Sequence, residues 1–310
     1  MNLNQLRVLV ALINRGSYTA AAEQLHLSQP AVSQQIKALE TACGVPVVER
    51  VDGKIVPTYA GEVLYRYAQS MLHIEEEAQH ALAGIKAGVK GRFVVGANTT
   101  GGMYITPPLI AAYRKDHPET EIIFRIEGTE SLLAALANRL LDLAIVGGPV
   151  TDKKLKAEPI LPDRVVLITS PHHPLSSRQQ IRAQDLANER FIIARYGSTT
   201  RRLIESRLRH KGVNLHIAME MAGTEDIKKA VEAGLGVAMV SQWSVLREVA
   251  AGHLRQIEIV DLDIRRDYVM VTNPARYYTP AAEDFMDFVR QYAPQLKPSN
   301  ILKSTPVTVP

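Results

Sequence analysis

Four polar side chains recur between residues 29 and 37, within a stretch that has helical periodicity. Gln29, Ser33 and Lys37 are four residues apart, and Gln34 stands beside them. On a helix this spacing gathers amides, a hydroxyl and one ammonium on one surface. Such groups can reach base edges and phosphates in the major groove of DNA. The alternative is a face that is merely solvated, because helix-turn-helix shapes occur in many proteins.

A short basic hairpin follows and favours the nucleic-acid interpretation. The segment "VPVVERVDGKIVPTYAG" has the pattern of a strand, an Asp-Gly turn and a second strand. Arg50 and Lys54 flank the turn, so the hairpin is placed as a wing for backbone or minor-groove contact. The predicted DNA-contacting residues are Ser28, Gln29, Pro30, Ser33, Gln34, Lys37, Arg50 and Lys54.

Hydroxyl-bearing residues follow several apolar runs in the second part of the chain. Thr99 and Thr100 come after "RFVVGA", and "RYGSTTR" comes after "FIIA". Ligands of open α/β sheets bind outside the carboxyl ends of strands, and helix N-termini attract anions. Ordinary helix capping explains each hydroxyl singly, whereas several converging on one cleft favour a small-molecule site. The predicted ligand-contacting residues are Thr99, Thr100, Thr129, Gly147, Arg195, Ser198, Thr199, Thr200 and Thr224.

Motifs for catalysis, metals or nucleotide cofactors are not found. Gly234 and Gly236 follow a helical pattern and open a strand, which is the reverse of a dinucleotide fingerprint. The pair His172 and His173 lacks further histidines or cysteines at metal-binding spacing. No G-x-S-x-G motif or P-loop occurs. The sequence therefore predicts no catalytic centre, no metal and no cofactor.

A tight helical corner is predicted to position the polar face. Apolar residues at helical spacing predict a helix over 3–15, and Ser17 can cap a second helix over 18–25. The three alanines at 20–22 are small enough to let another helix approach closely. Ser28 can cap the third helix, which carries the polar face.

A heptad pattern predicts how two copies pair. The helix expected over residues 59–87 carries apolar residues spaced four and three apart, starting at Ala60. The alternative is an amphipathic helix packed on its own domain. The predicted dimer seam comprises Leu64, Tyr67, Met71, Ile74, Ala78, Ala81 and Ile85. A flexible joint is expected over residues 87–91.

From Arg92 onward, short apolar runs alternate with helical patterns, which predicts βαβ units and a mainly parallel sheet. The stretch 296–310 is polar and proline-rich and is predicted to be a loose tail.

Residues 1–61 resemble the winged helix-turn-helix domain of the LysR-type transcriptional regulators. The residues that carry the resemblance are "AAAEQLHLSQPAVSQQIKALE", Gly44, "ER" at 49–50 and "PTYAG" at 57–61. The order of the later elements is similar to the effector domain of that family. The implied fold is an N-terminal, mainly α winged helix-turn-helix, a long linker helix, and an α/β effector domain with two lobes like periplasmic solute-binding proteins.

The resemblance also implies domain bounds. These are 1–58 for DNA binding, 59–88 for the linker helix and 89–310 for effector binding, with lobe I at about 89–162 and 268–296 and lobe II at about 163–267. Two crossing segments, near 161–172 and 264–272, would form the hinge. In the family, positions matching Thr99, Thr100, Thr129 and the 195–200 loop line the effector pocket. Ser241 departs from the pattern, because many relatives carry proline there.

The implied function is sequence-specific regulation of transcription by a small, anionic metabolite, without enzymatic activity. Implied partners are double-stranded DNA with an interrupted palindromic operator, the metabolite, further copies of the chain and RNA polymerase. The copies would form a dimer through the linker helix and a tetramer through the effector domains. The alternative is a cytoplasmic solute-binding or enzymatic α/β protein with an accessory helical module.

Composition agrees with this interpretation. The chain has 310 residues, a formal net charge of +4 and one cysteine, Cys43. A single cysteine fits a reducing compartment, and neither a signal peptide nor a membrane span is evident, so the cytoplasm is predicted. Residues 1–59 hold five Lys or Arg against four Asp or Glu, a net of +1. Because phosphate affinity depends on charge, one copy should bind DNA only modestly.

Overall fold

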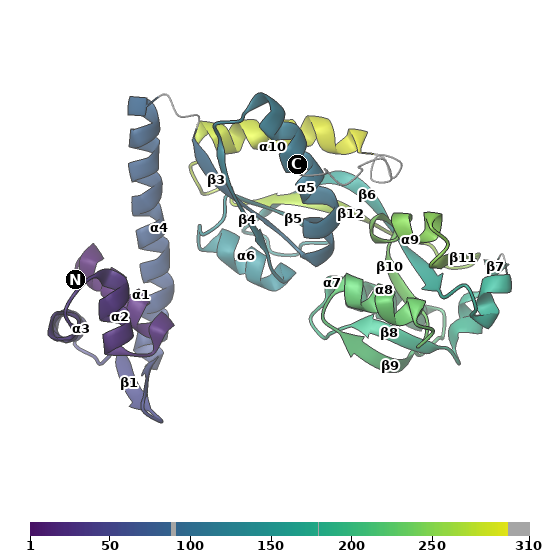
Figure 1. The fold of residues 1–310 in the computed structure, drawn as a ribbon, viewed down its shortest axis with the longest axis horizontal. Helices are drawn as coiled ribbons and strands as arrows, with labels where there is room; N and C mark the ends of the chain where they lie inside the picture. The colour runs from purple at the N-terminus through teal and green to yellow at the C-terminus, as the bar shows by residue number, and fades with distance from the viewer. Residues whose placement is uncertain (88–90, 179, 297–310) are drawn as a thin grey trace, which may run out of the picture. The chain divides into compact units, whose positions relative to one another are not determined.

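The computed structural model describes residues 1–87, 91–178 and 180–296, with the backbone alone at 77, 80, 81 and 83–87. The chain divides into two compact units, residues 1–89 and residues 90–310 apart from Asn138–Leu140 (Figure 1). Most of the predicted joint at 87–91 and almost all of the predicted tail at 296–310 lie outside the described residues.

The first unit contains four helices and one hairpin within its described residues. Its elements are α1 (Leu3–Arg15), α2 (Tyr18–Leu25), α3 (Gln29–Cys43), β1 (Val48–Val51), β2 (Lys54–Pro57) and α4 (Tyr59–Ala87). The apolar stripe of α3, which is Val32, Ile36 and Leu39, is buried against α1 and α2. Ala21 and Ala22 are buried at the same corner, as their small volume predicts.

One of the two predicted helix caps forms, and Thr58 caps α4. Ser28 Oγ accepts from the backbone N–H of Ala31 at 3.3 Å, and Thr58 Oγ1 accepts from that of Gly61 at 3.1 Å. The prediction for Ser17 is wrong in one respect. Ser17 occupies the N-cap position of α2, but its side chain makes no capping hydrogen bond.

Gly61 allows α4 to begin tightly against the loop before the hairpin. A Cβ at this position would lie 1.8 Å from the carbonyl oxygen of Val47. The same oxygen accepts a hydrogen bond from the N–H of Thr58 at 3.2 Å. The glycine of "PTYAG" is therefore required by a close backbone approach.

The second unit has two lobes that share one large sheet. Its strands are β3 (Arg92–Ala97), β4 (Glu121–Ile126), β5 (Leu143–Gly147), β6 (Lys156–Thr169), β7 (Gln180–Ile181), β8 (Arg190–Ala194), β9 (His216–Met221), β10 (Ala238–Ser241), β11 (Arg255–Ile259) and β12 (Ile264–Thr272). Its α-helices are α5 (Thr106–Asp116), α6 (Thr129–Ala137), α7 (Thr199–His210), α8 (Thr224–Glu232), α9 (Leu246–Ala250) and α10 (Pro280–Tyr292). A π-helical turn, η1 (Gly101–Ile105), and the 3₁₀ turns η2 (Pro174–Ser177), η3 (Ala183–Leu186), η4 (Gln242–Ser244) and η5 (Ala293–Gln295) complete it.

The sheet is mixed, so the prediction of a mainly parallel sheet is wrong. Its order is β4-β3-β5-β12-β6-β11-β7, and β10 also pairs with β6. The pairs β3–β4, β3–β5 and β8–β9 are parallel, as expected of βαβ units. Strands β12 and β6 instead pair antiparallel with each other, and β12 also with β5 and β6 also with β10 and β11. The two strands carry the chain between the lobes in opposite directions.

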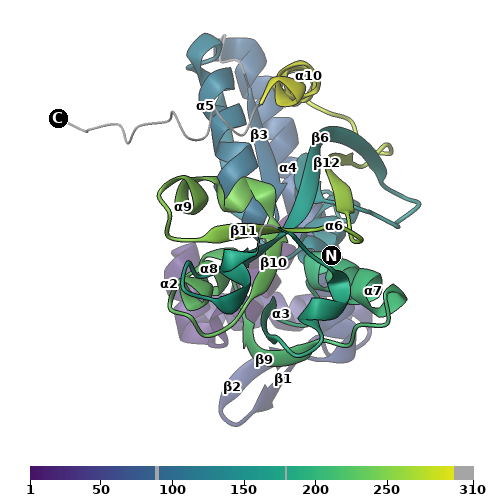
Figure 2. The same cartoon turned by 90° about the vertical axis from the view of Figure 1, so that its right-hand side faces the viewer.

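These two strands lie side by side and form the connection between the lobes (Figure 2). Strand β6 is long and runs from Lys156 to Thr169. Pro159 and Pro162 interrupt the apolar pattern within it. The register of β6 against β12 shifts between Leu161 and Pro159, opposite Tyr268 and Val269.

Helices cover both faces of each lobe's sheet. In the first lobe, alternate residues of β3 point to opposite sides: Phe93 joins α5 and α10, and Val94 joins α6. In the second lobe, Val165 and Val166 of β6 divide between two cores in the same way. The short elements η3, β7, β11 and α9 complete the second lobe.

Candidate functional site

The polar face of α3 is open to solvent. All six predicted residues on and before this helix are exposed, namely Ser28, Gln29, Pro30, Ser33, Gln34 and Lys37. The apolar stripe on the opposite side of the helix, Val32, Ile36 and Leu39, is buried in the core. The helix is therefore anchored on one side and presents amide, hydroxyl and ammonium groups on the other.

The hairpin presents its two cations at the turn. Arg50 and Lys54 are exposed, and neither makes an ion pair within the described part of the chain. Asp52 and Gly53 have φ angles of 49° and 79°. Two consecutive positive φ angles define a type I′ turn, for which Asp-Gly is a favoured sequence. The turn thus keeps both cations free for an anionic partner.

Helix α4 packs on its own domain along one side and leaves an apolar stripe exposed on another. Ala68 is buried in the domain core and Leu64 packs against it. Tyr67, Met71 and Ile74 are 63%, 40% and 41% exposed. Of the remaining predicted seam residues, Ala78 is exposed, and the side chains of Ala81 and Ile85 lie outside the described residues.

A cleft of about 430 Å³ lies between the two lobes of the second unit. Eight of the nine predicted ligand-contacting residues line it: Thr99, Thr100, Thr129, Arg195, Ser198, Thr199, Thr200 and Thr224. The N-termini of α6, α7 and α8 all open into this space. These helices follow β4, β8 and β9, so the two-lobed topology brings the ends of these strands to the same cleft.

Gly147 is the exception, since it is not among the lining residues. A Cβ on Gly147 would lie 3.0 Å from Cζ of Arg266. The glycine ends β5 next to a guanidinium and gives it room. Its role is to accommodate Arg266, a residue that the sequence pattern did not single out.

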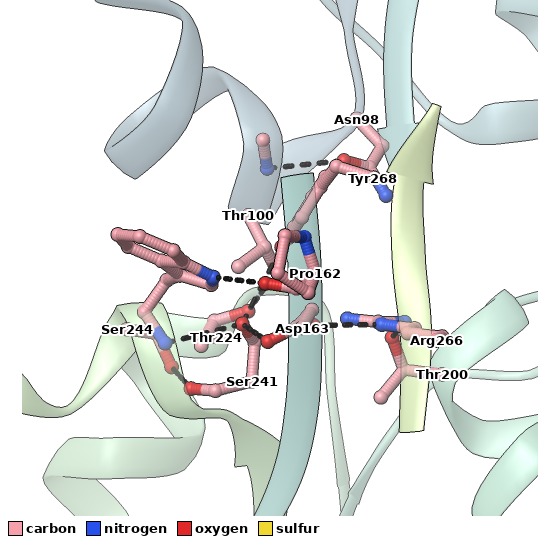
Figure 3. A network of polar contacts seen from close by, with 12 residues as sticks. Asn98, Thr100, Pro162, Asp163, Thr200, Thr224, Ser241, Ser244, Arg266 and Tyr268 are labelled. Atoms are coloured by element: carbon pink, nitrogen blue, oxygen red, sulfur yellow. Dashed lines mark hydrogen bonds and ion pairs between the residues drawn. The ribbon is translucent and has the colours of Figure 1, made fainter. Parts of the chain in front are cut away.

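Beneath the cleft lies a buried polar network built on Asp163 and Arg266 (Figure 3). Arg266 Nε donates to Asp163 Oδ2 at 2.8 Å, and Arg266 Nη1 donates to Thr200 Oγ1 at 2.7 Å. Ser241 Oγ donates to Asp163 Oδ1 at 2.7 Å. Burial raises the pKa of the Asp163 carboxyl, although Arg266 and Ser241 oppose the shift. Burial also raises the pKa of Tyr268 to about 12.

Side chains also link the lobes directly. The hydroxyls of Thr100 and Thr224 are 3.0 Å apart, and either can be the donor (Figure 3). One helical turn further on, Lys228 Nζ is 2.8 Å from the hydroxyl of Tyr104 and 2.6 Å from Glu248 Oε1. Lys228 is buried, so this cation depends on its partners for charge compensation.

Several lining residues escaped the sequence analysis. They are Asn98, Glu127, Glu130, Tyr196 and Met239, with Ser241 noted earlier only as a departure from a family pattern. Asn98 directly precedes Thr99, and Glu127 and Glu130 flank Gly128–Thr129, so the strand-end rule could have found these three. Arg201 also lines the cleft, but Glu205 and Glu220 hold its guanidinium. No group of metal-binding side chains occurs among the described residues. None of the described helices is long and apolar enough to span a bilayer.

Both units match models of known protein families. Residues 3–62 match the family model described as bacterial regulatory helix-turn-helix protein, lysR family. Residues 86–294 match the model described as LysR substrate binding domain.

Two curated relatives are similar along most of their length. The probable RuBisCO transcriptional regulator of Guillardia theta is 37% identical over 289 residues, covering 91% of this chain and 93% of that protein. The HTH-type transcriptional regulator CbbR of Xanthobacter flavus is 37% identical over 293 residues, covering 93% and 87%.

Two solved structures share the fold. The crystal structure of CbnR, a LysR family transcriptional regulator, covers 94% of this chain and 99% of that chain with a TM-score of 0.75 and 19% identity. The regulatory domain of CcmR from Synechocystis PCC6803, in complex with 2-PG, covers 65% and 97% with a TM-score of 0.61 and 24% identity.

Proposed function

We propose, because the chain belongs to the LysR family of bacterial transcriptional regulators, that its controlling molecule is a small anionic metabolite bound in the cleft between the lobes. The family consists of DNA-binding regulators that respond to small molecules, not of enzymes. The observation that carries the proposal is the convergence of three helix N-termini and their hydroxyls on one cleft of about 430 Å³.

The electrostatics of the cleft support an anion. Each N-terminus of α6, α7 and α8 presents backbone N–H groups and a partial positive charge, which favours an anion by about 0.3–1 kcal/mol. Arg195 lines the cleft and makes no ion pair within the described residues. Arg202 is already paired with Glu130 at 3.1 Å. Arg195 is therefore the available cation for an entering anion.

Two acidic residues restrict which anions fit. Glu127 and Glu130 line the same cleft. Glu127 accepts a short hydrogen bond from Ser131, and Glu130 pairs with Arg202, so both are partly satisfied. A carboxylate lining favours hydrogen-bond donors on the ligand. An anion that also carries hydroxyl groups fits this combination better than a purely anionic one.

The DNA-contacting residues follow from the first unit. We assign base contacts to Gln29, Ser33 and Gln34, and phosphate contacts to Lys37, Arg50 and Lys54, because all are exposed on one helix and one hairpin. Ser28 and Pro30 shape the start of that helix. With only one net positive charge in residues 1–59, tight binding requires at least two copies.

The exposed stripe of α4 supports pairing through this helix. We propose a dimer along Tyr67, Met71, Ile74 and Ala78, with Leu64 at its edge, and a tetramer through the effector domains as the functional form. We assign the protein to the cytoplasm, because a bacterial transcriptional regulator must have access to DNA. Both curated relatives are regulators, and the one from Guillardia theta is described as regulating RuBisCO transcription. Sequences upstream of RuBisCO genes are therefore the first operators to test.

The effector proposal is tested by thermal unfolding of the full chain with 2-PG, inorganic phosphate and the neutral polyol glycerol. A bound ligand raises stability by mass action, about 2.7 kcal/mol at one hundred times Kd. We expect the anions to raise the unfolding temperature and glycerol at equal concentration to leave it unchanged. An equal response to glycerol, or no response to any anion, contradicts an anionic effector.

A further inference from the structure

The two hydroxyls beside the Asp163–Arg266 pair differ in what they can offer a ligand. The ion pair is fully internal, with side-chain exposures of 0% for Asp163 and 3% for Arg266. A guanidinium only donates hydrogen bonds and a carboxylate only accepts them. Each partner therefore dictates the direction of the hydrogen bond made by the hydroxyl that it touches (Figure 3).

Thr200 is left as a donor. Its Oγ1 accepts from Arg266 Nη1 at 2.7 Å, so its own hydrogen must point elsewhere. No acceptor takes that hydrogen within the described part of the chain. Since Thr200 lines the cleft at the first turn of α7, the free hydrogen is available to a bound molecule.

The hydroxyl of Ser241, in contrast, has already donated its hydrogen within the protein. Its hydrogen goes to Asp163 Oδ1 at 2.7 Å, and its oxygen accepts from the backbone N–H of Trp243 at 3.3 Å. Ser241 also lines the cleft, but it has no hydrogen left to donate. The ion pair thus makes Thr200, and not Ser241, the donor at the base of the cleft.

Two further groups beside Thr200 lack partners. Arg266 Nη2 and Thr199 Oγ1 are buried and make no hydrogen bond among the described residues. Buried polar groups in native proteins almost always have a partner. Thr199 lines the cleft at the first turn of α7, so its hydroxyl can bond an oxygen-bearing group of a bound molecule, whereas the Arg266 guanidinium also lies over the Tyr268 ring, 5.6 Å from its centroid.

We propose that Arg266 is a positioning residue of the effector site, which holds Thr200 as a hydrogen-bond donor and thereby selects effectors that place an anionic oxygen at the first turn of α7. The proposal rests on the anionic effector proposed above. Because Asp163 and Arg266 stand on β6 and β12, the strands that join the lobes, the donor is also fixed relative to the hinge.

A double-mutant cycle tests whether Arg266 acts through Thr200. The full chain is titrated with 2-PG and with inorganic phosphate. Fluorescence of Trp243 reports binding, because it is the chain's single tryptophan and its indole N–H bonds Pro162 O at 3.1 Å, next to Asp163. The variants are Thr200→Val, Arg266→Lys and the two combined.

We expect each single variant to weaken Kd by about tenfold, the size of one hydrogen bond to a charged group. The combined variant should be no weaker than either single one, because the two share one interaction. Thr200→Ser keeps the hydroxyl and should bind like the wild type. Arg265→Lys, one residue along β12 and largely exposed, is the matched control and should leave Kd unchanged.

Independent effects that multiply in the combined variant overturn the proposal, as does unchanged affinity in Arg266→Lys. If Arg266→Lys does not fold, Asp163→Asn combined with Arg266→Met replaces it in the cycle, because removing both ions leaves no unpaired buried charge. A wild-type chain that responds to neither anion overturns the anionic effector and this proposal together. A responding wild type with independent effects overturns the role of Arg266 alone.

Discussion

Replacing Ile74 by aspartate tests the assembly on which tight DNA binding depends. Ile74 is 41% exposed on α4, so a partner helix can bury at most that fraction. Full burial of an isoleucine side chain contributes about 1.5–3 kcal/mol, and 41% of this is about 0.6–1.2 kcal/mol. A symmetric dimer contains the residue twice, which gives about 1.2–2.4 kcal/mol.

At about 1.4 kcal/mol per tenfold change, loss of this burial alone weakens the dimer about 7- to 50-fold. Ile74→Asp should exceed that range, because it also places two carboxylates in an apolar seam. Ile74 is a cleaner choice than Leu64, which packs against the core of its own domain. Gln79→Asp adds the same charge at an exposed position outside the seam and serves as the control.

Light scattering over a dilution series measures the mass, and fluorescence anisotropy with operator DNA measures binding. We expect Ile74→Asp to dissociate at concentrations where the wild type and Gln79→Asp remain dimeric, and its DNA affinity to fall in parallel. Far-ultraviolet circular dichroism should match the wild type, because Ile74 is outside the core. A wild-type mass for Ile74→Asp at every concentration refutes the seam.

Three other outcomes are expected from variants of single residues. Ser33→Ala should lose about 1–3 kcal/mol of discrimination at one base pair, whereas Lys54→Ala should weaken all sequences alike and reduce the salt dependence measured by anisotropy. Gly61→Ala should destabilise the first unit by about 1–3 kcal/mol in calorimetry, because its Cβ would lie 1.8 Å from a carbonyl oxygen. Thr100→Val should impair the response to effector in a DNA-binding titration and spare binding without effector, because Thr100 lines the cleft, where it bonds Thr224, and lies outside the first unit.

The N-terminal elements could be predicted because their signals are local. The Asp-Gly turn needs two positive φ angles, and few residue pairs other than these adopt them readily. Val32, Ile36 and Leu39 recur at helical spacing, and all three pack into the same hydrophobic core. Local propensity, pattern and packing agree in this region, so the sequence alone was sufficient.

The polar network under the cleft could not be predicted in the same way. Asp163 and Arg266 are about one hundred residues apart, and each stands next to prolines or other charged residues that suggest an exposed loop. Only the antiparallel pairing of β6 with β12 brings them together. The sequence around a single charged residue does not indicate whether a distant residue will form a buried ion pair with it.

Gly147 illustrates a related limit of the strand-end rule. The rule identifies the edge of the sheet where ligands bind, and the threonines that it selected line the cleft. It does not say what fills the space next to each strand. At β5 that space is taken by the guanidinium of Arg266, so the glycine serves the protein's own side chain.

The two ion pairs at the cleft differ in how they connect a bound molecule to the strands that join the lobes. At the rim, Arg202 and Glu130 are 58% and 72% exposed, and solvent screens a pair of this kind strongly. At the base, Asp163 and Arg266 are excluded from water and join the two crossing strands. Under the proposal for Arg266, a molecule that accepts the Thr200 hydrogen is connected through Arg266 and Asp163 to both strands. A ligand held only at the rim lacks this connection, because Arg202 and Glu130 belong to α7 and α6 and to neither crossing strand. The buried pair therefore offers a connection between the cleft and both crossing strands, beside the direct contacts of Thr100 with Thr224 and of Lys228 with Tyr104.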